Sequence, residues 1–385
     1  MRIGIIGAGR LGLTFALLCK KAGYEVIVSD RREDYVFNLN NGICNTNEPL
    51  IQKMLFEIES LSATTNNIEI IENSDVIFTF VATPSTTDGR YDTSAVFEVA
   101  NDFFEASRLD IPVFNKKFIV GCTTNPGDVG QIQDKLSMFS IQVAYNPEFI
   151  AQGEIVKGLE QSDIVLIGTE YNELSNDLIQ IYERIQTTPV NAHVMSPKAA
   201  EITKIGINCF LTTKISYANM LGEILTKSNL GHEINSVLNA VGGDSRVGKK
   251  YMRYGFGFGG PCLPRDNRAL GHYANELGMK LNLPLTVDEF NNEHADFIKN
   301  FFMKQNPDKT IPFVMNYITY KKGTDILEES QQFKLCLDLL EEGYYVNVIE
   351  IDAVIKQLSD LDEQFDGRLK FYKPGTSPEG FVINL

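Results

Sequence analysis

The sequence predicts an α/β protein of two or three domains. With 385 residues the chain is longer than one ordinary compact domain. Near its start, a short apolar strand, a glycine-rich turn, a helix and a second strand follow one another, which is the order of a parallel βαβ unit. Residues 198–228 have the apolar spacing of one long helix, and residues 333–351 return to a helix followed by a strand.

Composition and charge limit the classes of function. Hydrophobic residues make up 43% of the chain and charged residues 22%, as in globular proteins. The net charge of −15 argues against nucleic-acid binding, which depends on a cationic surface. We find neither an apolar run of roughly 18 residues nor a signal-peptide pattern, so we expect a cytoplasmic protein that does not enter a membrane.

Cysteine and histidine are dispersed along the sequence. Without a C-x-x-C pair, the six cysteines suggest neither a zinc site nor a disulfide framework, and we expect five of them to be packed thiols. We assign no chemistry to the four histidines and interpret each as a surface or structural residue. These residues are Cys19, Cys44, Cys122, Cys209, Cys262 and Cys336, and His193, His232, His272 and His294.

The first 30 residues carry a dinucleotide-binding pattern. An apolar strand at 3–6 leads into Gly7-Ala8-Gly9-Arg10-Leu11-Gly12, and the strand at 25–30 ends in an acid, Asp30. In such a pattern the glycines permit a tight turn, a close approach of the backbone to a pyrophosphate, and close packing of helix on strand. The alternative is a glycine-rich turn in some other α/β protein. We predict cofactor contacts at Gly7, Gly9, Arg10, Leu11, Gly12 and Asp30.

The acid at position 30 bears on which cofactor binds. Asp30 would accept hydrogen bonds from a ribose diol and repel a 2′-phosphate, which favours NAD over NADP. Arg31 and Arg32 follow directly and keep NADP open as an alternative.

Two further strands, at 75–81 and 117–121, continue the parallel sheet and end in polar turns. Ligands of open α/β sheets bind beyond the carboxyl ends of the strands. We therefore interpret Thr83 and Thr123 as candidate contacts of a cofactor or active site, with simple turn formation as the alternative.

The long helix carries a cation and an amide on one face. Lys204 and Asn208 are four residues apart and project from the helix one turn from each other. Such a pair could bind one developing oxyanion, although taken alone it also fits a solvated helix face.

A glycine-dense loop at 255–266 ends in Cys262 and Asp266. Glycines allow close approach to a ligand, and Phe256 and Phe258 could exclude water. A thiol near Lys204 or Arg265 would have its thiolate form favoured, although a packed structural cysteine is the alternative. Arg246, Lys249, Lys250, Arg253 and Arg265 supply the local cations that an anionic substrate needs on so acidic a chain.

Taken together, these motifs resemble those of the UDP-glucose/GDP-mannose dehydrogenase family over roughly residues 1–300. The resemblance implies an N-terminal NAD-binding Rossmann domain at 1–195, a central helical domain built on the long helix at 196–300, and a reduced Rossmann-like domain for the nucleotide sugar at 301–385. It also implies a homodimer. The motifs that carry it are Gly7 to Gly12, Thr83-Pro84, Asn146-Pro147-Glu148-Phe149, Glu201 with Lys204 and Asn208, Gly243 to Gly248, and Gly257 to Asp266.

The activity implied by the resemblance is an NAD-dependent four-electron oxidation of a nucleotide-sugar CH₂OH group to a carboxylate. Cys262 would capture the aldehyde as a thiohemiacetal and carry the acid as a thioester. UDP-glucose is the expected substrate and UDP-glucuronate the product. GDP-mannose and a UDP-N-acetylhexosamine are the alternatives.

The resemblance further implies roles for single residues. Lys204 and Asn208 would stabilise the charged oxygen, Asp266 would position water and tune the lysine, and Thr123 and Glu148 would handle proton and water. The bland alternatives are a helix N-cap for Asp266 and a surface cation for Arg246. The implied substrate contacts are Glu148, Phe149, Lys204, Asn208, Arg246, Tyr251, Phe256, Gly257 and Gly259.

Three positions depart from the family's pattern. Gln152 stands where many members have an acid, Arg265 replaces a lysine, and Glu328 stands where an arginine is expected. A two-electron dehydrogenase of the β-hydroxyacid or 6-phosphogluconate type would share the layout but would not need Cys262. A catalytically lapsed nucleotide-sugar binder is the alternative from another class.

Overall fold

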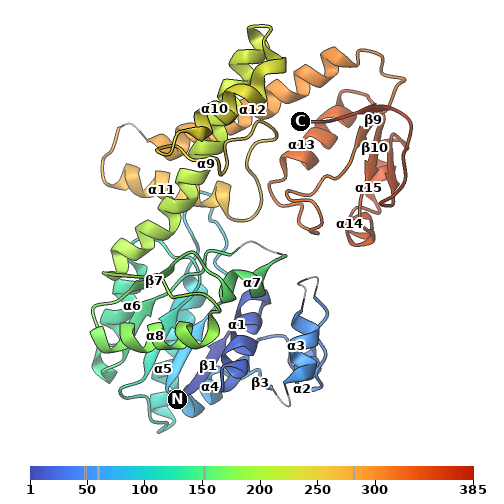
Figure 1. The fold of residues 1–385 in the computed structure, drawn as a ribbon. Coiled ribbons are helices and arrows are strands. Elements are labelled where there is room, and N and C mark those ends of the chain that lie inside the picture. The colour runs from blue at the N-terminus through green and yellow to red at the C-terminus, as the bar shows by residue number, and fades with distance from the viewer. Residues whose placement is uncertain (47, 49, 59–60, 151–152, 281) are drawn as a thin grey trace. The chain divides into compact units, whose positions relative to one another are not determined.

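The computed structural model describes residues 1–46, 48, 50–58, 61–150, 153–280 and 282–385. Gln152 lies outside the described residues. The chain forms two compact units, Met1–Lys204 and Ile205–Leu385, each with its own sheet (Figure 1).

The first unit is built on an eight-stranded sheet with the order β3-β2-β1-β4-β5-β6-β7-β8 in the described part of the chain. Neighbouring strands are parallel except β6 and β7, which pair antiparallel. The strands predicted at 3–6, 25–30, 75–81 and 117–121 are confirmed as β1, β2, β4 and β5, with small shifts at their ends. The strands are β1 (Arg2–Ile6), β2 (Glu25–Ser29), β3 (Ser62–Thr64), β4 (Val76–Thr79), β5 (Lys117–Val120), β6 (Gln142–Tyr145), β7 (Val165–Gly168) and β8 (Ala192–Met195).

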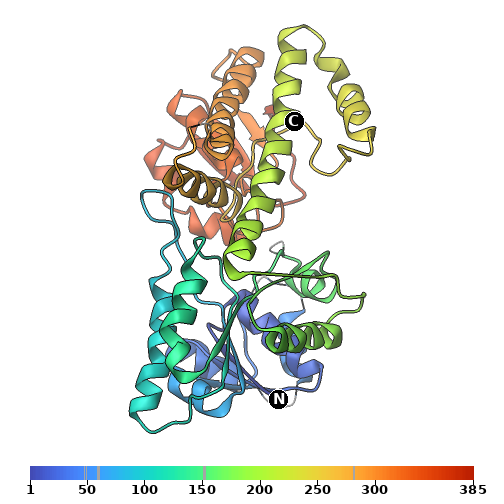
Figure 2. The ribbon, with the colours of Figure 1, turned by 90° about the vertical axis from the view of Figure 1, so that its left-hand side faces the viewer.

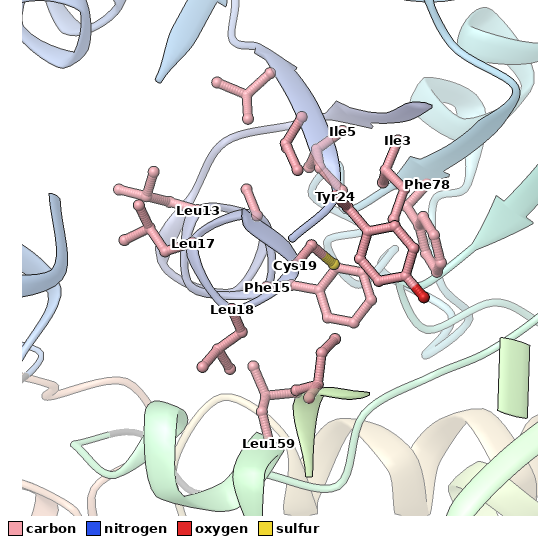
Figure 3. Packing of buried hydrophobic residues seen from close by; sticks show 14 of the residues in the cluster. Ile3, Ile5, Leu13, Phe15, Leu17, Leu18, Cys19, Tyr24, Phe78 and Leu159 are labelled. Atoms are coloured by element: carbon pink, nitrogen blue, oxygen red, sulfur yellow. The ribbon is translucent and has the colours of Figure 1, made fainter. Parts of the chain in front are cut away.

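Helices cover both faces of this sheet, and each face has its own apolar core. On one face α1 is packed between strand residues such as Ile3 and Phe78 and Leu159 of α7 (Figure 3). On the other face lie α5 and α6, drawn in teal in Figure 2. The helices are α1 (Arg10–Lys21), α2 (Glu33–Asn40), α3 (Ile51–Glu57), α4 (Asn67–Asn73), α5 (Ser94–Arg108), α6 (Asp128–Leu136), the 3₁₀ turn Ser137–Phe139, α7 (Ile155–Glu160) and α8 (Asn172–Ile185).

One long helix, α9 (Pro197–Lys227), follows the large sheet and continues into the second unit. It confirms the helix predicted at 198–228. The other helices of the central region are α10 (Ile234–Gly243), which follows the 3₁₀ turn Gly231–Glu233, α11 (Leu263–Glu276) and α12 (Leu283–Gln305).

The C-terminal region forms a four-stranded parallel sheet with the order β11-β10-β9-β12. The helix and strand predicted at 333–351 are present, so the reduced Rossmann-like domain and the α/β class are confirmed. No described helix is long and apolar enough to cross a membrane. The elements are β9 (Phe313–Met315), α13 (Gln331–Glu341), β10 (Val346–Ile349), α14 (Asp352–Gln357), α15 (Leu361–Gln364), β11 (Leu369–Tyr372) and β12 (Phe381–Val382).

Candidate active site

The turn between β1 and α1 has the geometry of a phosphate cradle. Gly7 has a φ of +95°, and a β-carbon on Gly12 would lie 2.1 Å from the Gly7 carbonyl oxygen. A β-carbon on Gly9 would meet nothing within 4 Å, so the backbone there faces open space. Gly9 is also the N-cap of α1, whose start has no side-chain cap hydrogen bond and no acid in its first turn. These features fit a bound pyrophosphate, which helix N-termini attract.

Asp30 follows β2 and is paired with a neighbouring arginine. Its carboxylate accepts hydrogen bonds from Arg32 Nε and Nη2, both at 2.8 Å. Burial alone would raise the pKa of Asp30, but these bonds outweigh it and the pKa is lowered. The Arg32 guanidinium lies 4.0 Å from the centre of the Tyr35 ring, and the Tyr35 hydroxyl donates to the Ala8 carbonyl. The arginine and the tyrosine therefore link the acid to the glycine turn, a contact that the sequence pattern did not predict.

Glu148 lies just beyond β6, buried in the first unit. The Tyr182 hydroxyl of α8 donates to its carboxylate. Burial raises the pKa of Glu148 to about 7, although this hydrogen bond and the charge of Lys204 oppose the change. The Lys204 ammonium donates to the Glu148 carbonyl oxygen at 2.6 Å and lies 4.5 Å from the centre of the Phe149 ring. The structure thus brings together three predicted site residues, Glu148, Phe149 and Lys204.

The loop after β5 is fastened to the start of α9. The buried carboxylate of Glu201 accepts from the Gly127 amide at 2.6 Å and the Val129 amide at 3.0 Å. It also accepts from the Thr124 hydroxyl at 2.9 Å. Thr123 precedes this anchor and is half-buried, and Thr83 lies in the turn after β4 with 9% of its surface exposed. The loop and the helix that carries Lys204 therefore hold one another in place.

Cys262 is the N-cap of α11. All six cysteines lie in the described part of the chain; Cys262 is exposed, Cys122 is half-buried and the other four are buried. An exposed thiol at a helix N-terminus is placed where the positive end of the helix dipole favours an anion.

Asp266 lies one turn after Cys262, where its amide donates to the Cys262 carbonyl. Its buried carboxylate accepts from the Asn208 amide at 2.5 Å. The Cys209 thiol donates to the Asp266 carbonyl at 3.4 Å, so two consecutive residues of α9 bind the first turn of α11. The N-cap alternative for Asp266 is therefore wrong, because this residue lies inside the helix and the cap is Cys262.

A pocket of about 780 Å³ opens in the second unit. Lys249, Lys250 and Arg253 line it, so cations surround it despite the negative net charge of the chain. Of the predicted substrate contacts, Tyr251, Phe256 and Gly257 line it as well. Three more tyrosines, Tyr254, Tyr317 and Tyr320, also line the pocket.

Several residues of the second unit that the sequence singled out do not line this pocket: Asn208, Arg246, Phe258, Gly259, Cys262, Arg265, Asp266 and Glu328. The Arg246 side chain is 88% exposed and paired with Asp244. A β-carbon on Gly259 would lie 2.3 Å from the Glu329 carbonyl, so this glycine packs against a neighbouring loop. Glu328 is exposed, and its position outside the lining keeps the reversed charge away from the pocket wall. The described residues contain no group of three or more His, Cys, Asp or Glu side chains that could hold a metal ion.

Comparison with known proteins gives consistent matches along most of the chain. Residues 1–186 match the NAD-binding domain, and residues 198–293 the central domain, of the UDP-glucose/GDP-mannose dehydrogenase family. A Bacillus subtilis protein named putative UDP-glucose 6-dehydrogenase is 29% identical over 368 residues, which cover 93% of this chain and 83% of the relative.

Solved structures show the same architecture. A UDP-glucose dehydrogenase from the archaeon Pyrobaculum islandicum has a TM-score of 0.85 at 25% identity, over 96% of this chain and 85% of that one. A UDP-D-ManNAc dehydrogenase from Pyrococcus horikoshii has a TM-score of 0.78, over 99% and 98% of the two chains, and at 21% identity it shows the shared fold alone.

Proposed function

Because the chain belongs to the UDP-glucose/GDP-mannose dehydrogenase family of NAD-dependent oxidoreductases, we propose that it oxidises the C6 hydroxymethyl group of UDP-glucose to the carboxylate of UDP-glucuronate. Each turnover consumes one sugar nucleotide, one water and two NAD⁺, and releases two NADH. The observation that carries the proposal is the exposed thiol of Cys262 at the start of α11, one turn before Asp266.

The glycine turn and Asp30 would hold NAD⁺, and two NAD⁺ bound in succession would each supply the hydride acceptor for one oxidation. Open space at Gly9 and the uncapped start of α1 support a pyrophosphate at this turn. The lowered pKa of Asp30 keeps its carboxylate ionised at neutral pH, as an acceptor for a ribose hydroxyl and against a 2′-phosphate.

Cys262 supplies the covalent step. Its thiolate attacks the aldehyde carbon left by the first oxidation, so that a C–S bond forms and the aldehyde oxygen becomes the hydroxyl of a thiohemiacetal. The second oxidation converts this adduct into a thioester. Water then attacks the thioester, the C–S bond breaks, and the carboxylate leaves while the thiolate is restored. Covalent attachment keeps the aldehyde from escaping between the oxidations.

Lys204 and Asn208 are suited to the charge that develops on the substrate oxygen. They lie four residues apart on α9, and Asp266 fixes the amide of Asn208. An amide nitrogen carries two N–H groups, so this bond leaves a second donor on Asn208 for the substrate. Glu148, with its pKa raised to about 7, is suited to accept a proton from water near neutral pH.

The cationic pocket of the second unit supports a nucleotide-sugar substrate. Lys249, Lys250 and Arg253 offer charges to a diphosphate. Tyr251, Tyr317 and Tyr320 offer ring faces and hydroxyls to a base or ribose. Within the same proposal, GDP-mannose and a UDP-N-acetylhexosamine remain the alternative substrates.

We also propose a homodimer that forms through α9. Three large side chains along this helix are unusually exposed: Phe210 by 65%, Tyr217 by 49% and Ile224 by 51%. They are spaced by seven residues, which is close to two helical turns, so they lie along nearly the same side of the helix. A second copy of the chain would cover this stripe.

A panel of nucleotide sugars incubated with NAD⁺ tests the proposed function, with NADH followed by its absorbance. We expect UDP-glucose to be turned over best, with two NADH formed for each sugar consumed and UDP-glucuronate as product. One NADH per sugar would identify a two-electron dehydrogenase instead. Binding of sugar nucleotides without any turnover would identify a lapsed enzyme.

A further inference from the structure

The backbone of the glycine-rich segment 255–258 is held by side chains from two helices. Asn219 of α9 accepts from the Gly255 amide at 3.0 Å. Asn291 of α12 accepts from the Phe258 amide and donates to the Phe258 carbonyl, both at 2.9 Å. Gly255, Phe256 and Gly257 line the cationic pocket, so these contacts fix part of its wall.

His294 makes a third contact with the same segment. It lies on α12, three residues after Asn291, and its side chain is 1% exposed. Its Nε2 lies 2.8 Å from the Gly255 carbonyl oxygen, and its Nδ1 lies 2.7 Å from a Glu223 carboxylate oxygen of α9. The imidazole therefore bridges α9 and the glycine-rich segment 255–258, the pocket loop.

These two contacts fix the proton content of the pair. A carbonyl oxygen only accepts, so Nε2 must carry a proton and donate to Gly255. A neutral imidazole then has a bare lone pair on Nδ1, which would face a carboxylate oxygen at 2.7 Å. The observed distance requires one proton between Nδ1 and Glu223, whichever atom holds it. When that proton dissociates, the two lone pairs repel each other and the bridge opens.

The surroundings of the pair are aromatic, with few other charges. Phe290 and Phe297 stack on the two sides of the imidazole along α12, and the Tyr254 ring meets its edge. Burial raises the pKa of Tyr254 to about 12, so this phenol stays neutral. The charged groups that face the pair are Lys227 of α9, 3.6 Å from the Glu223 carboxylate, and Asp338 of α13 with its partner Lys334.

Tyr254 also explains why the loop must come so close to α9. A β-carbon on Gly222 would lie 2.0 Å from the Tyr254 ring, so the ring occupies the space of a missing side chain. Tyr254 thus packs against α9 at Gly222, the residue before Glu223.

We propose that His294 and Glu223 form a proton-sharing pair that positions the pocket loop for the nucleotide sugar. Neither residue is a catalytic residue, because each acts through the backbone of Gly255. The inference rests on the proposed function, since the loop is taken to bind the substrate. Loss of either hydrogen bond of His294 would loosen the loop and weaken substrate binding, with little effect on NAD⁺ at the glycine turn of the first unit.

Steady-state kinetics test the proposal with two variants. Glu223→Gln keeps a donor for Nδ1, so its KM for UDP-glucose should equal the wild-type value. His294→Phe removes both hydrogen bonds, and its KM should rise about tenfold with a smaller change in kcat. The KM for NAD⁺ should not change in either variant.

Two further variants separate positioning from general damage. His294→Gln restores a donor for the Gly255 carbonyl and should recover most of the affinity that His294→Phe loses. His232→Phe alters a histidine that is 73% exposed and lies beside Glu233, and it should behave as wild type. A KM that rises as much in Glu223→Gln as in His294→Phe, or an unchanged KM in His294→Phe, would overturn the proposal.

Two measurements on the protein do not depend on turnover. The chain has only four histidines, so ¹⁵N-labelled side chains can be assigned by NMR. The His294 ring should show Nε2 protonated and Nδ1 hydrogen-bonded at neutral pH, and hydrogen exchange at 255–258, compared at one pH, should be faster in His294→Phe than in wild type. If no nucleotide sugar is oxidised, the proposed function fails, while these readouts still decide on the pair. A His294 ring with a bare Nδ1 at neutral pH would contradict it.

Discussion

At the scale of single residues, Glu148 links pH to the proposed hydrolysis. Because burial raises its pKa to about 7, the carboxyl is neutral below that pH and can act as a base only above it. The hydrogen bond from Tyr182 lowers this pKa, so Tyr182→Phe should move the acid limb of kcat to higher pH by about half to one unit. Profiles of kcat against pH measure the shift.

Two controls belong to that experiment. Tyr171→Phe changes a tyrosine just before the same helix and should leave the acid limb where it is in wild type. Glu148→Gln should lower kcat and abolish the limb. A limb that persists in Glu148→Gln would show that another group provides the base.

The thiol of Cys262 leads to a second expectation. Cys262→Ala should lower acid formation by at least about a thousandfold, since the covalent route is lost, while NAD⁺ and nucleotide-sugar binding persist. The side chain is exposed, so its truncation leaves no buried cavity and the melting temperature should stay the same. Product analysis, calorimetry and thermal unfolding measure the three quantities. Acid formation at the wild-type rate would rule out a covalent intermediate at this residue.

Residue by residue, the sequence indicated the groups that carry chemistry better than those that support them. Lys204, Glu148 and Phe149 were expected in one site and do lie together. Tyr182 and His294 received no role, because their partners Glu148 and Glu223 lie 34 and 71 residues away in the chain. Helical or strand spacing contains no information about contacts over such separations, and only the folded chain reveals them.

At the scale of elements, strong local patterns were sufficient for prediction. The strands around the glycine turn and the 31-residue helix α9 appear where their apolar spacing placed them. The antiparallel pairing of β6 with β7 and the attachment of β12 to β9 did not follow from the sequence. Strand order depends on how the helices pack between strands, and short strands such as β12 carry little periodicity of their own.

The hydrogen bonds that Glu201 of α9 accepts from the loop after β5 give a prediction at this scale. Glu201→Gln replaces one carboxylate oxygen with an NH₂ group, which cannot accept a hydrogen bond, so either the Gly127 amide or the Val129 amide loses its acceptor. The loss should lower the free energy of unfolding by about 1 to 3 kcal/mol. Thermal or denaturant unfolding measures it, with an expected fall in melting temperature of about 2 to 4 °C per kcal/mol.

Glu105→Gln is the matched control for that variant. It alters an exposed carboxylate paired with Arg108 on α5, where an ion pair contributes little to stability. The two variants should therefore differ clearly. Equal stabilities would show that the hydrogen bonds of Glu201 are not needed to hold the start of α9.

At the scale of the whole molecule, the exposed stripe of α9 predicts the state of association. The wild-type protein should have twice the chain mass of 43.1 kDa in light scattering or sedimentation. Phe210→Glu should yield a particle of 43.1 kDa, because a carboxylate would be buried in the interface. Phe114→Glu, on a phenylalanine that is 63% exposed in the first unit, should remain a dimer. A monomeric wild-type protein at micromolar concentration would contradict the proposed interface.

The close contact between Gly222 and Tyr254 limits what protein engineering can do with this chain. Glycine within a helix lowers stability by roughly 1 kcal/mol relative to alanine, so such a position is an obvious first target for raising heat tolerance. Here the added methyl group would displace the tyrosine ring and the loop that follows it. A substitution that stabilises the helix at this position would therefore weaken substrate binding, and the glycine is best left unchanged.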